Sequence, residues 1–501
     1  MDVGQLDLEL VVLGVGALLL AGLAAIKTSH RLGTPVLLLF VGIGLLIGEG
    51  GMGLAFDDAQ LTAQAGTLFL AVILWDGGFT TRLSEIRPVA APAAVLATVG
   101  VLASVAVTSA LVWVLLDVDV RTALILGAVA SSTDAAATFA VLRNLPILRR
   151  IRTTLEAESG MNDPPVIVLV SVIVSDAWGQ VSPGAMLGMA AYQLVVGALA
   201  GFVIAWLGVR LLRASALPAS GLYPLGTVAI GMIAFAGAGQ VSASGLLAAY
   251  VAGVVVGNAQ LPHARTTQGF CESLAWLAQM GLFTMLGLLA SPSRLPEAAL
   301  TALIVGAALT FVARPLSVAA CLIPFRVPLR EQVFIAWGGL RGAVPIVLAS
   351  LTMSAGVPGA THIFDVVFLL VIIFTLIQGP TLPVVARFTG VRARTPLTQL
   401  TFESAPLEKV DLTVVQLSIP RGSRLHGVAI SELRLPHPVA IPMVIRGGRV
   451  LVPGRWTVLH HGDDLVLTTP PEFVPRVERR LNDVDRWGRL ARWRRPEAQP
   501  H

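Results

Sequence analysis

Long apolar runs recur along the first 390 residues of this 501-residue chain, and they limit the folds that it can adopt. A helix needs about 20 apolar residues to cross the hydrocarbon core of a bilayer. Charged residues make up only 13% of the chain. We therefore predict an all-α polytopic membrane protein with about thirteen transmembrane helices. The predicted cores are residues 8–26, 35–54, 60–79, 89–116, 121–142, 157–178, 184–212, 222–240, 243–261, 270–290, 296–323, 331–356 and 361–388.

Basic residues in the loops between these runs predict the topology. With the N-terminus outside, the loops that face the cytoplasm contain Lys27, Arg31, Arg82, Arg87, Arg143, Arg149, Arg150, Arg152, Arg210, Arg213, Arg265, Arg326 and Arg330. The outward loops contain only Arg121 and Arg294. Because cytoplasmic loops are enriched in Lys and Arg, this bias predicts an odd number of spans and a cytoplasmic C-terminus in the cell (inner) membrane. Residues 1–9 contain no Lys or Arg, so the first run is expected to be a retained span rather than a secretory signal.

The chain changes character after the last apolar run. We divide it into a transmembrane domain (1–390), a polar linker (391–402), a small α+β cytoplasmic domain (403–485) and a basic tail (486–501). Two short strand patterns flank Gly447-Gly448, which is a hairpin signal. The tail carries five Arg residues and two Trp residues, so it is expected either to contact anionic lipid or to be a solvated end. Cys271 and Cys321 lie within apolar runs and predict neither a disulfide nor a metal site.

Charged and polar residues inside the sixth run mark a candidate site. Ionisable groups within a membrane are costly, so each one suggests a function. On a helix, Ser159 and Asp163 share one face, and Glu158 and Asn162 share another. We expect Asp163 to bind ions, and we expect the second face to dock against a neighbouring helix. The alternative is a buried polar network that only holds helices together.

Two further runs are interrupted. The fifth contains Ser131-Ser132-Thr133-Asp134, and the twelfth contains Gly338-Gly339-Leu340-Arg341-Gly342 followed by Pro345. Paired interruptions in the two halves of a transporter indicate its binding site at the membrane midplane. Ordinary close packing of small residues is the alternative for the glycines.

Two other buried charges need an explanation. Arg314 lies deep in the eleventh run and requires a partner, for which we predict Glu158. That pairing leaves Asp163 as the free carboxylate. Asp76 in the third run is a candidate position on the ion pathway.

Residues 8–390 resemble the monovalent cation:proton antiporters of the NhaP and sodium/proton exchanger kind. The resemblance rests on the order and spacing of Thr133-Asp134, Glu158-Ser159, Asn162-Asp163, Arg314 and Gly339-Leu340-Arg341-Gly342-Ala343. It implies thirteen spans with inverted repeats, a six-helix core bundle, a dimerising interface bundle, and fifth and twelfth spans that cross as unwound helices. It also implies that Asp163 alternately carries the proton and the cation, and that Glu158 pairs with Arg314. Thr133, Asp134 and Ser159 would complete the ion shell.

Other residues resemble a particular subgroup of these antiporters, and the soluble domain resembles a known regulatory domain. The Asn162-Asp163 pair resembles the electroneutral branch, and Pro165 with Asp76-Gly77-Gly78 resembles the bacterial potassium/proton, cell-volume-regulation subgroup. Residues 419–435, 445–449 and 461–464 resemble the RCK_C (TrkA-C-like) half of potassium-conductance regulator domains. That resemblance implies a β-rich regulatory module that binds a small ligand of unknown identity. A purely structural role is the alternative.

These features predict a secondary active antiporter rather than an enzyme, with no cofactor and no nucleic-acid partner. Its expected partners are K⁺ or Na⁺, H⁺, membrane lipid and a second copy of the chain. The sequence leaves the choice between K⁺ and Na⁺ open. A ligand-gated K⁺ channel or uptake subunit is a weaker alternative, because no repeated filter loop is present. A membrane sensor is weaker still, since an anchor needs no buried charge network.

Overall fold

The computed structural model describes residues 8–32, 36–53, 56, 58–134, 138, 142, 145, 147–175, 178–180, 182–215, 217–259, 261–391, 401–407, 412–420 and 422–488. The chain forms two compact units, residues 1–392 and 393–501, and each is described by itself. The predicted linker and basic tail lie largely outside the described residues.

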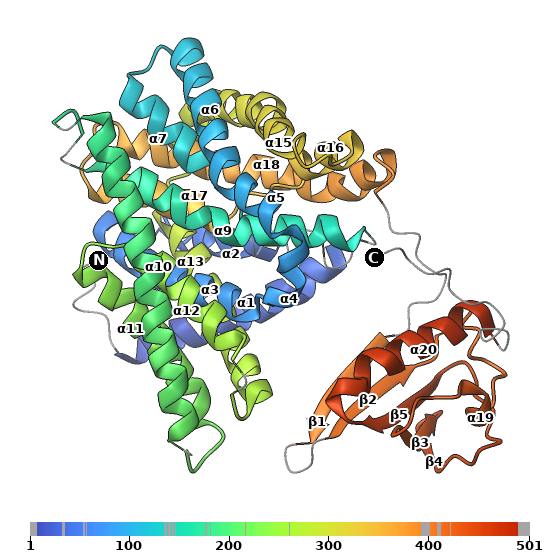
Figure 1. Ribbon diagram of the computed structural model, residues 1–501. Helices are drawn as coiled ribbons and strands as arrows, with labels where there is room; N and C mark the ends of the chain where they lie inside the picture. The colour runs from blue at the N-terminus through green and yellow to red at the C-terminus, as the bar shows by residue number, and fades with distance from the viewer. Residues whose placement is uncertain are drawn as a thin grey trace. The chain divides into compact units, whose positions relative to one another are not determined.

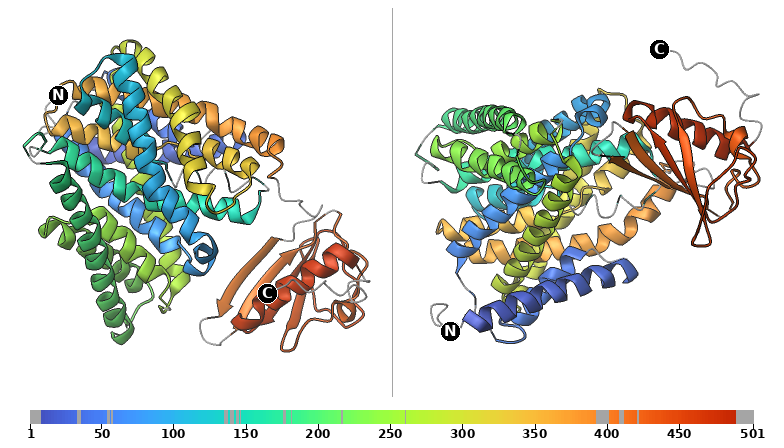
Figure 2. Two further views of the ribbon diagram at one scale, coloured as in Figure 1. Left: turned by 45° about the horizontal axis from the view of Figure 1, so that its top comes forward. Right: turned by 90° about the horizontal axis from the view of Figure 1, so that it is seen from below.

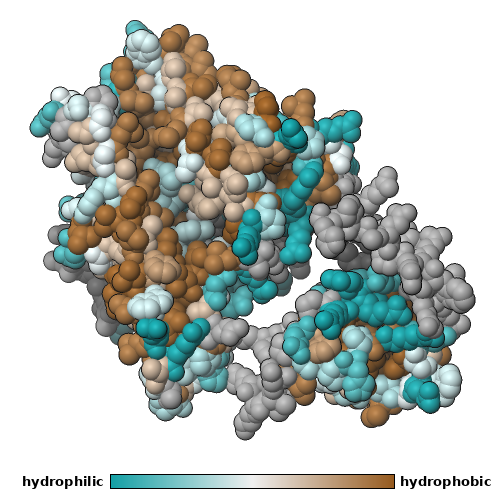
Figure 3. Space-filling view, in the orientation of Figure 1, coloured by the Kyte–Doolittle hydropathy of each residue, from teal (hydrophilic) through white to brown (hydrophobic). Residues whose placement is uncertain are grey.

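The first unit is helical (Figures 1 and 2). Its elements are α1 (Leu8–Leu32), α2 (Val36–Ile47), α3 (Ala59–Thr80), α4 (Leu83–Ile86), η2 (Arg87–Val89), α5 (Ala90–Val95), η3 (Leu96–Gly100), α6 (Val101–Leu116), α7 (Val120–Ser131), α9 (Arg149–Val174), α10 (Pro183–Ala214), α11 (Leu222–Gln240), α12 (Gly245–Gly257), α13 (Ala264–Leu289), α14 (Leu295–Ala307), η4 (Ala308–Ala313), α15 (Arg314–Leu322), α16 (Leu329–Trp337), α17 (Ala343–Ser354) and α18 (Ala360–Phe388). Among the described residues, eight continuous helical segments are long and apolar enough to span a bilayer, and five shorter apolar helices accompany them. Together these segments confirm the predicted all-α polytopic fold. Figure 3 shows the broad apolar surface that such helices present to lipid.

Two predicted spans are interrupted, as their polar and glycine-rich residues indicated. In the fifth, α7 ends at Ser131 and residues 132–134 are not helical, and in the twelfth, residues 338–342 separate α16 from α17. The sixth span differs from its predicted bounds. The sixth helix, α9, begins at Arg149 rather than near residue 157. Its first turns carry the basic residues Arg149, Arg150 and Arg152, which an apolar count does not recognise as helical. The earlier start places Asp163 near the middle of α9.

Glycines bring several helices into backbone contact. A Cβ atom at Gly253 or Gly257 of α12 would lie against the carbonyl oxygens of Trp75 and Phe79 on α3. Likewise, a Cβ atom at Gly78 of α3 would lie against a backbone carbonyl of α12. In a lipid bilayer the hydrophobic effect does not drive helices together, so they associate through close van der Waals packing. Small residues make that close packing possible. We call this α3–α12 contact the glycine seam.

The second unit is an antiparallel five-stranded sheet in the order β1-β2-β5-β3-β4. Its elements are β1 (Thr401–Leu407), β2 (Leu412–Ser418), α19 (Ile430–Leu433), β3 (Ala440–Arg446), β4 (Arg449–Leu451), β5 (Asp463–Thr469), η5 (Pro471–Phe473) and α20 (Val474–Trp487). Gly447 and Gly448 both have positive φ angles and join β3 to β4, as the hairpin signal predicted. Apolar residues of β2 and β5 form one core with Val477 and Leu481 of α20.

Candidate ion-binding site

Two interrupted helices meet near the middle of the first unit. Residues 132–134 follow α7, and residues 338–342 separate α16 from α17. The backbone nitrogen of Asp134 donates to the carbonyl oxygen of Leu340 over 2.9 Å, and the nitrogen of Ala343 donates to Asp134 Oδ2 over 3.1 Å. The breaks therefore satisfy each other's freed backbone groups, as irregular backbone within a membrane requires. We call residues 132–134 and 338–342 the helix crossing.

Glycine is required at two positions of the helix crossing. A Cβ atom at Gly342 would collide with the carboxylate of Asp134. A Cβ atom at Gly339 would lie 3.0 Å from the Arg314 guanidinium and 3.1 Å from Thr133 Cγ2. The glycines thus serve close approach to charged and polar side chains. Helix packing by small residues alone does not explain them.

Asp163 lies beside the helix crossing and is 2% exposed. Ser132 Oγ donates to Asp163 Oδ1 over 2.7 Å. The chain at Ser132 is extended, which turns this hydroxyl from the path of α7 toward α9. Pro164 and Pro165 lie inside α9 but have no backbone N–H groups. The carbonyl groups of Gly160 and Met161, one turn earlier, therefore lack their usual helical donors.

The other predicted shell residues form a second cluster. Thr133 Oγ1 lies 3.1 Å from Ser159 Oγ, and Asn162 Nδ2 donates to Thr133 Oγ1 over 2.5 Å. All three residues are at most 1% exposed. The structure therefore joins Ser159 to Asn162 through Thr133, although the helical pattern assigned them to different faces.

A buried ion pair lies on a further side of α9. Arg314 donates from Nη1 and Nη2 to the two carboxylate oxygens of Glu158 over 2.5 and 2.9 Å. Arg341 is also buried, and its Nη1 donates to the carbonyl oxygen of Gly339 over 3.1 Å. The bidentate geometry satisfies the Glu158 carboxylate, so it is not available as an ion ligand.

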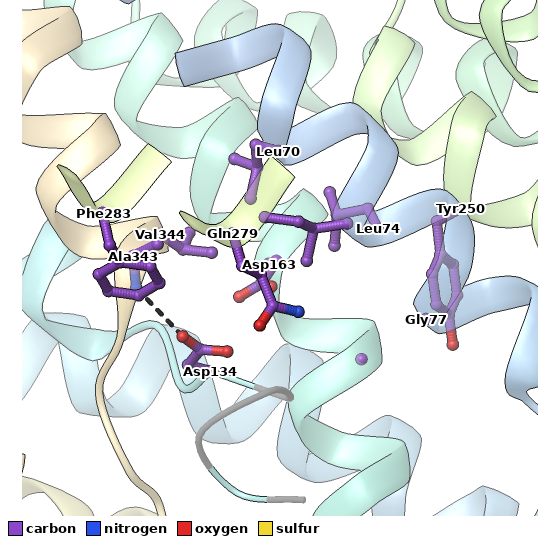
Figure 4. Close-up of a pocket in the computed structure, with 12 residues that line it drawn as sticks. Leu70, Leu74, Gly77, Asp134, Asp163, Tyr250, Gln279, Phe283, Ala343 and Val344 are labelled. Atoms are coloured by element: carbon purple, nitrogen blue, oxygen red, sulfur yellow. Dashed lines mark hydrogen bonds between the residues drawn. The ribbon is translucent and has the colours of Figure 1, made fainter. Parts of the chain in front are cut away.

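A cavity of about 30 Å³ lies between the helix crossing and α3. Figure 4 shows Asp134, Asp163 and Gln279 around this space. Gly160 and Tyr250 also line it. Asp76 is not among the lining residues, although its neighbour along α3, residue 77, is.

Sequence reasoning missed three residues of this site. Ser132, rather than Thr133, bonds to Asp163, and Gln279 and Tyr250 line the cavity. A signal existed for Gln279, because an amide in the middle of an apolar helix is a costly group that needs a reason. Because Gln279 carries no charge, a criterion based on ionisable groups does not select it.

Comparisons with known proteins agree with this architecture. The profile described as sodium/hydrogen exchanger, transmembrane, matches residues 16–388, and the TrkA-C domain profile matches residues 414–482. The K(+)/H(+) antiporter NhaP of Alkalimonas amylolytica is 37% identical over 480 residues, covering 94% of this chain and 83% of that protein. The K(+)/H(+) antiporter NhaP2 of Shewanella sp. (strain MR-4) is 35% identical over 460 residues, covering 90% and 80%.

The fold has a solved counterpart. The sodium proton antiporter MjNhaP1 from Methanocaldococcus jannaschii, solved at pH 8, aligns with a TM-score of 0.66 and 22% identity, covering 75% of this chain and 98% of that chain. The profile match extends over most of the chain and includes both interrupted helices and α9. The chain therefore belongs to the sodium/hydrogen exchanger family of membrane antiporters and carries a C-terminal TrkA-C domain.

Proposed function

We propose that this protein exchanges K⁺ for H⁺ across the cell membrane, one for one, with Asp163 carrying the two ions in turn. The observation that carries the proposal is the hydrogen bond from Ser132 to a buried carboxylate beside the helix crossing. Two relatives that are at least 35% identical are named K(+)/H(+) antiporters, which favours K⁺. Na⁺ is the alternative cation, because the archaeal protein of the solved structure is named a sodium proton antiporter.

The chemistry of the Ser132 hydroxyl suits a group that changes its charge. A hydroxyl both donates and accepts, and its hydrogen rotates freely. Ser132 therefore donates to the Asp163 anion and can accept from the protonated acid without moving its oxygen. Asp134 is held differently. Its Oδ2 accepts from the backbone N–H of Ala343, and a backbone N–H can donate a hydrogen bond but cannot accept one. We assign proton and cation exchange to Asp163, and a fixed charge that holds the helix crossing to Asp134.

The remaining polar residues support this exchange. Glu158 and Arg314 neutralise each other, so the pair adds no net charge to the site. Thr133, Ser159 and Asn162 hold α9 against the first break through their mutual hydrogen bonds. Arg341 holds the second break through Gly339. Proton and cation then compete for one carboxylate, which makes exchange obligatory if the site crosses only when neutralised.

Alternating access requires the two sides of the cavity to move relative to each other. One side is formed by Asp134 of the helix crossing, α9 and the start of α17, and the other by α3, α12 and α13. We propose rigid-body rocking of the first side against the second, as in other transporters built from repeats. Asp76, on α3 close to the cavity, remains a candidate position on the ion pathway.

Topology and regulation are parts of the same proposal. The loop charges support an outside N-terminus and a cytoplasmic TrkA-C domain. We also propose a homodimer, which rests on membership of the sodium/hydrogen exchanger family, because the exposed apolar residues along α10 would face lipid equally well. We propose that the TrkA-C domain adjusts transport when it binds a small ligand whose identity is open.

Transport by everted vesicles containing the full chain tests the proposal. Dequenching of a pH-sensitive dye is measured after K⁺, Na⁺, Rb⁺ or Li⁺ is added, and we expect the largest response to K⁺. Asp163→Asn should reduce exchange at least 100-fold while the protein still inserts. Asp119→Asn is the matched control, because Asp119 caps α7 outside the cavity and Asn retains that function. Cation-coupled proton flux in the Asp163→Asn vesicles would rule out the mechanism.

A further inference from the structure

The ion cavity has polar side chains on both of its sides. Among the described residues that line it, Asp134 and Asp163 belong to the side formed with α9, whereas Gln279 of α13 and Tyr250 of α12 belong to the opposite side. The other lining residues are apolar or glycine. A side-chain oxygen from the side of α3, α12 and α13 therefore comes from Gln279 or Tyr250.

Of these two residues, Gln279 is the one that faces Asp163. Figure 4 shows Gln279 turned toward Asp163, and Tyr250 at the other end of the cavity. The Tyr250 hydroxyl lies against α9 about one turn before Asp163, because a Cβ atom at Gly160 would lie 3.3 Å from it. Among the described residues, no hydrogen bond engages the Gln279 amide. Its polar atoms are therefore available to a ligand inside the cavity.

An amide suits each state of the exchanging carboxylate. Its NH₂ group can donate to the Asp163 anion, and its oxygen can accept from the protonated acid or bind a cation. Neutral carbonyl oxygens are the ligands that replace the hydration shell of K⁺ in selective pores. The cavity measures only about 30 Å³, so a cation beside Asp163 also lies close to the Gln279 amide. Gln279 can thus supply an oxygen ligand without changing the charge of the site.

The cavity extends toward the face of the membrane that the loop charges assign to the cytoplasm. Its lining along α3 includes Leu70 and Gly77, which are about 10 Å apart along the helix axis, and α3 ends at Thr80. Arg82 lies in the loop that follows, which the excess of basic residues assigns to the cytoplasm. On this topology, Gln279 lies beside Asp163 while the site faces the cytoplasm.

We propose that Gln279 is a cation ligand that acts only while the site faces the cytoplasm. This role depends on exchange at Asp163 and on the rocking motion proposed above. Asp163 moves with α9, whereas Gln279 stays with α13, which packs against α2 and α3. Rocking therefore separates the two side chains as the site turns outward. The site then binds K⁺ more tightly from the cytoplasm than from outside.

Transport by the full-length protein in vesicles of two orientations tests the proposal. Everted vesicles present the cytoplasmic face to added K⁺, and right-side-out vesicles present the other face. Gln279→Met keeps the length of the side chain but removes the amide. The K⁺ concentration for half-maximal exchange should rise about fivefold in everted vesicles, the equivalent of one hydrogen bond, and less than twofold in right-side-out vesicles.

Gln268→Met is the matched control, because Gln268 is exposed on the same helix and is not among the residues that line the cavity. It should change neither value. Gln279→Asn withdraws the amide by one methylene group and should also raise the value in everted vesicles, so it replaces Gln279→Met where that variant does not insert.

An equal rise in both orientations would overturn the dependence on the cytoplasm-facing state, and no rise in either would overturn the role as a ligand. Both results would leave exchange at Asp163 intact. Cation-coupled proton flux in the Asp163→Asn vesicles would instead overturn the exchange mechanism, and the role of Gln279 with it.

Discussion

The glycine seam and the helix crossing lie on two sides of the same cavity, and they are held by different contacts. In the seam, glycines of α12 bring its backbone directly against α3, and shape alone fixes the distance. In the crossing, backbone and side-chain hydrogen bonds join the broken ends. Steric contact does not depend on charge, whereas a hydrogen-bonded carboxylate responds to a proton or a cation. The comparison indicates that the seam is the fixed wall and that the crossing is the responsive one.

The largest expected effect comes from breaking the seam. In Gly253→Val, the new side chain would lie against the Trp75 carbonyl and 2.9 Å from the Phe79 nitrogen, so the two backbones must separate. We expect loss of the folded protein, measured as the monodisperse fraction in size-exclusion chromatography. Gly188→Val on α10 is the control, because nothing lies within 4 Å of a Cβ there. Normal yield of Gly253→Val would show that the seam is not a rigid contact.

The second-largest effect is expected from breaking the buried ion pair between Arg314 and Glu158, which lies beside the crossing. Removing one partner of a buried ion pair leaves an uncompensated charge and costs about 3–5 kcal/mol. We therefore expect Arg314→Gln or Glu158→Gln alone to lower the thermal midpoint in detergent strongly. The double variant should recover most of the loss, because two amides can bond to each other. A double variant as unstable as the sum of the single variants would contradict the pairing.

The spans, the helix crossing and the buried ion pair were all predictable in outline from the sequence. Apolar runs predicted the spans. Four consecutive polar residues at 131–134 predicted an interruption, because on a regular helix they would point in all directions around an otherwise apolar span. The pairing of Arg314 with Glu158 was proposed from the cost of a lone buried cation. The structure places the two within hydrogen-bond distance.

The details of the crossing were not predictable. Helical periodicity ends at Ser131, so it does not determine which of the next three side chains faces Asp163. The extended backbone gives that contact to Ser132 and turns Thr133 toward Ser159. Gln279 reaches the cavity only because of how α13 packs against α3 and α17. Such contacts depend on tertiary packing, to which a pattern along one helix is blind.

A third prediction extends the contrast to the TrkA-C domain. Arg446 Nε and Nη2 each donate to the Asp463 carboxylate over 2.7 Å, and the backbone nitrogen of His460 donates to it over 2.8 Å. Burial opposes ionisation of Asp463, but these hydrogen bonds together outweigh it and hold its pKa below the usual range. The stability that they contribute is therefore present above about pH 4, the ordinary Asp value, and is lost as pH falls through the lower folded value.

Asp463→Asn tests the direction in which stability changes with pH. At pH 7 the variant should lose about 2 kcal/mol of protection against hydrogen–deuterium exchange in β5, measured in the full chain. The difference from the unsubstituted protein should shrink as pH falls below 4. Asp464→Asn is the control, because its carboxylate accepts from the exposed Ser418 hydroxyl instead. A difference that grew toward acid pH would contradict the assigned direction of the pKa shift.

The smallest effect is expected from Ser132, the first residue of the crossing, when it is compared with Ser131, the last residue of α7. Ser132 Oγ donates to Asp163, whereas Ser131 Oγ donates to the Gly127 carbonyl within α7. Ser132→Ala removes a ligand and a donor from the exchanging carboxylate, a loss of about 1 kcal/mol. The cation concentration for half-maximal exchange should then rise about fivefold at constant pH, while Ser131→Ala should change it less than twofold. Equal effects of the two substitutions would mean that the crossing responds as a rigid wall, like the seam, and that Ser132 has no special role in exchange.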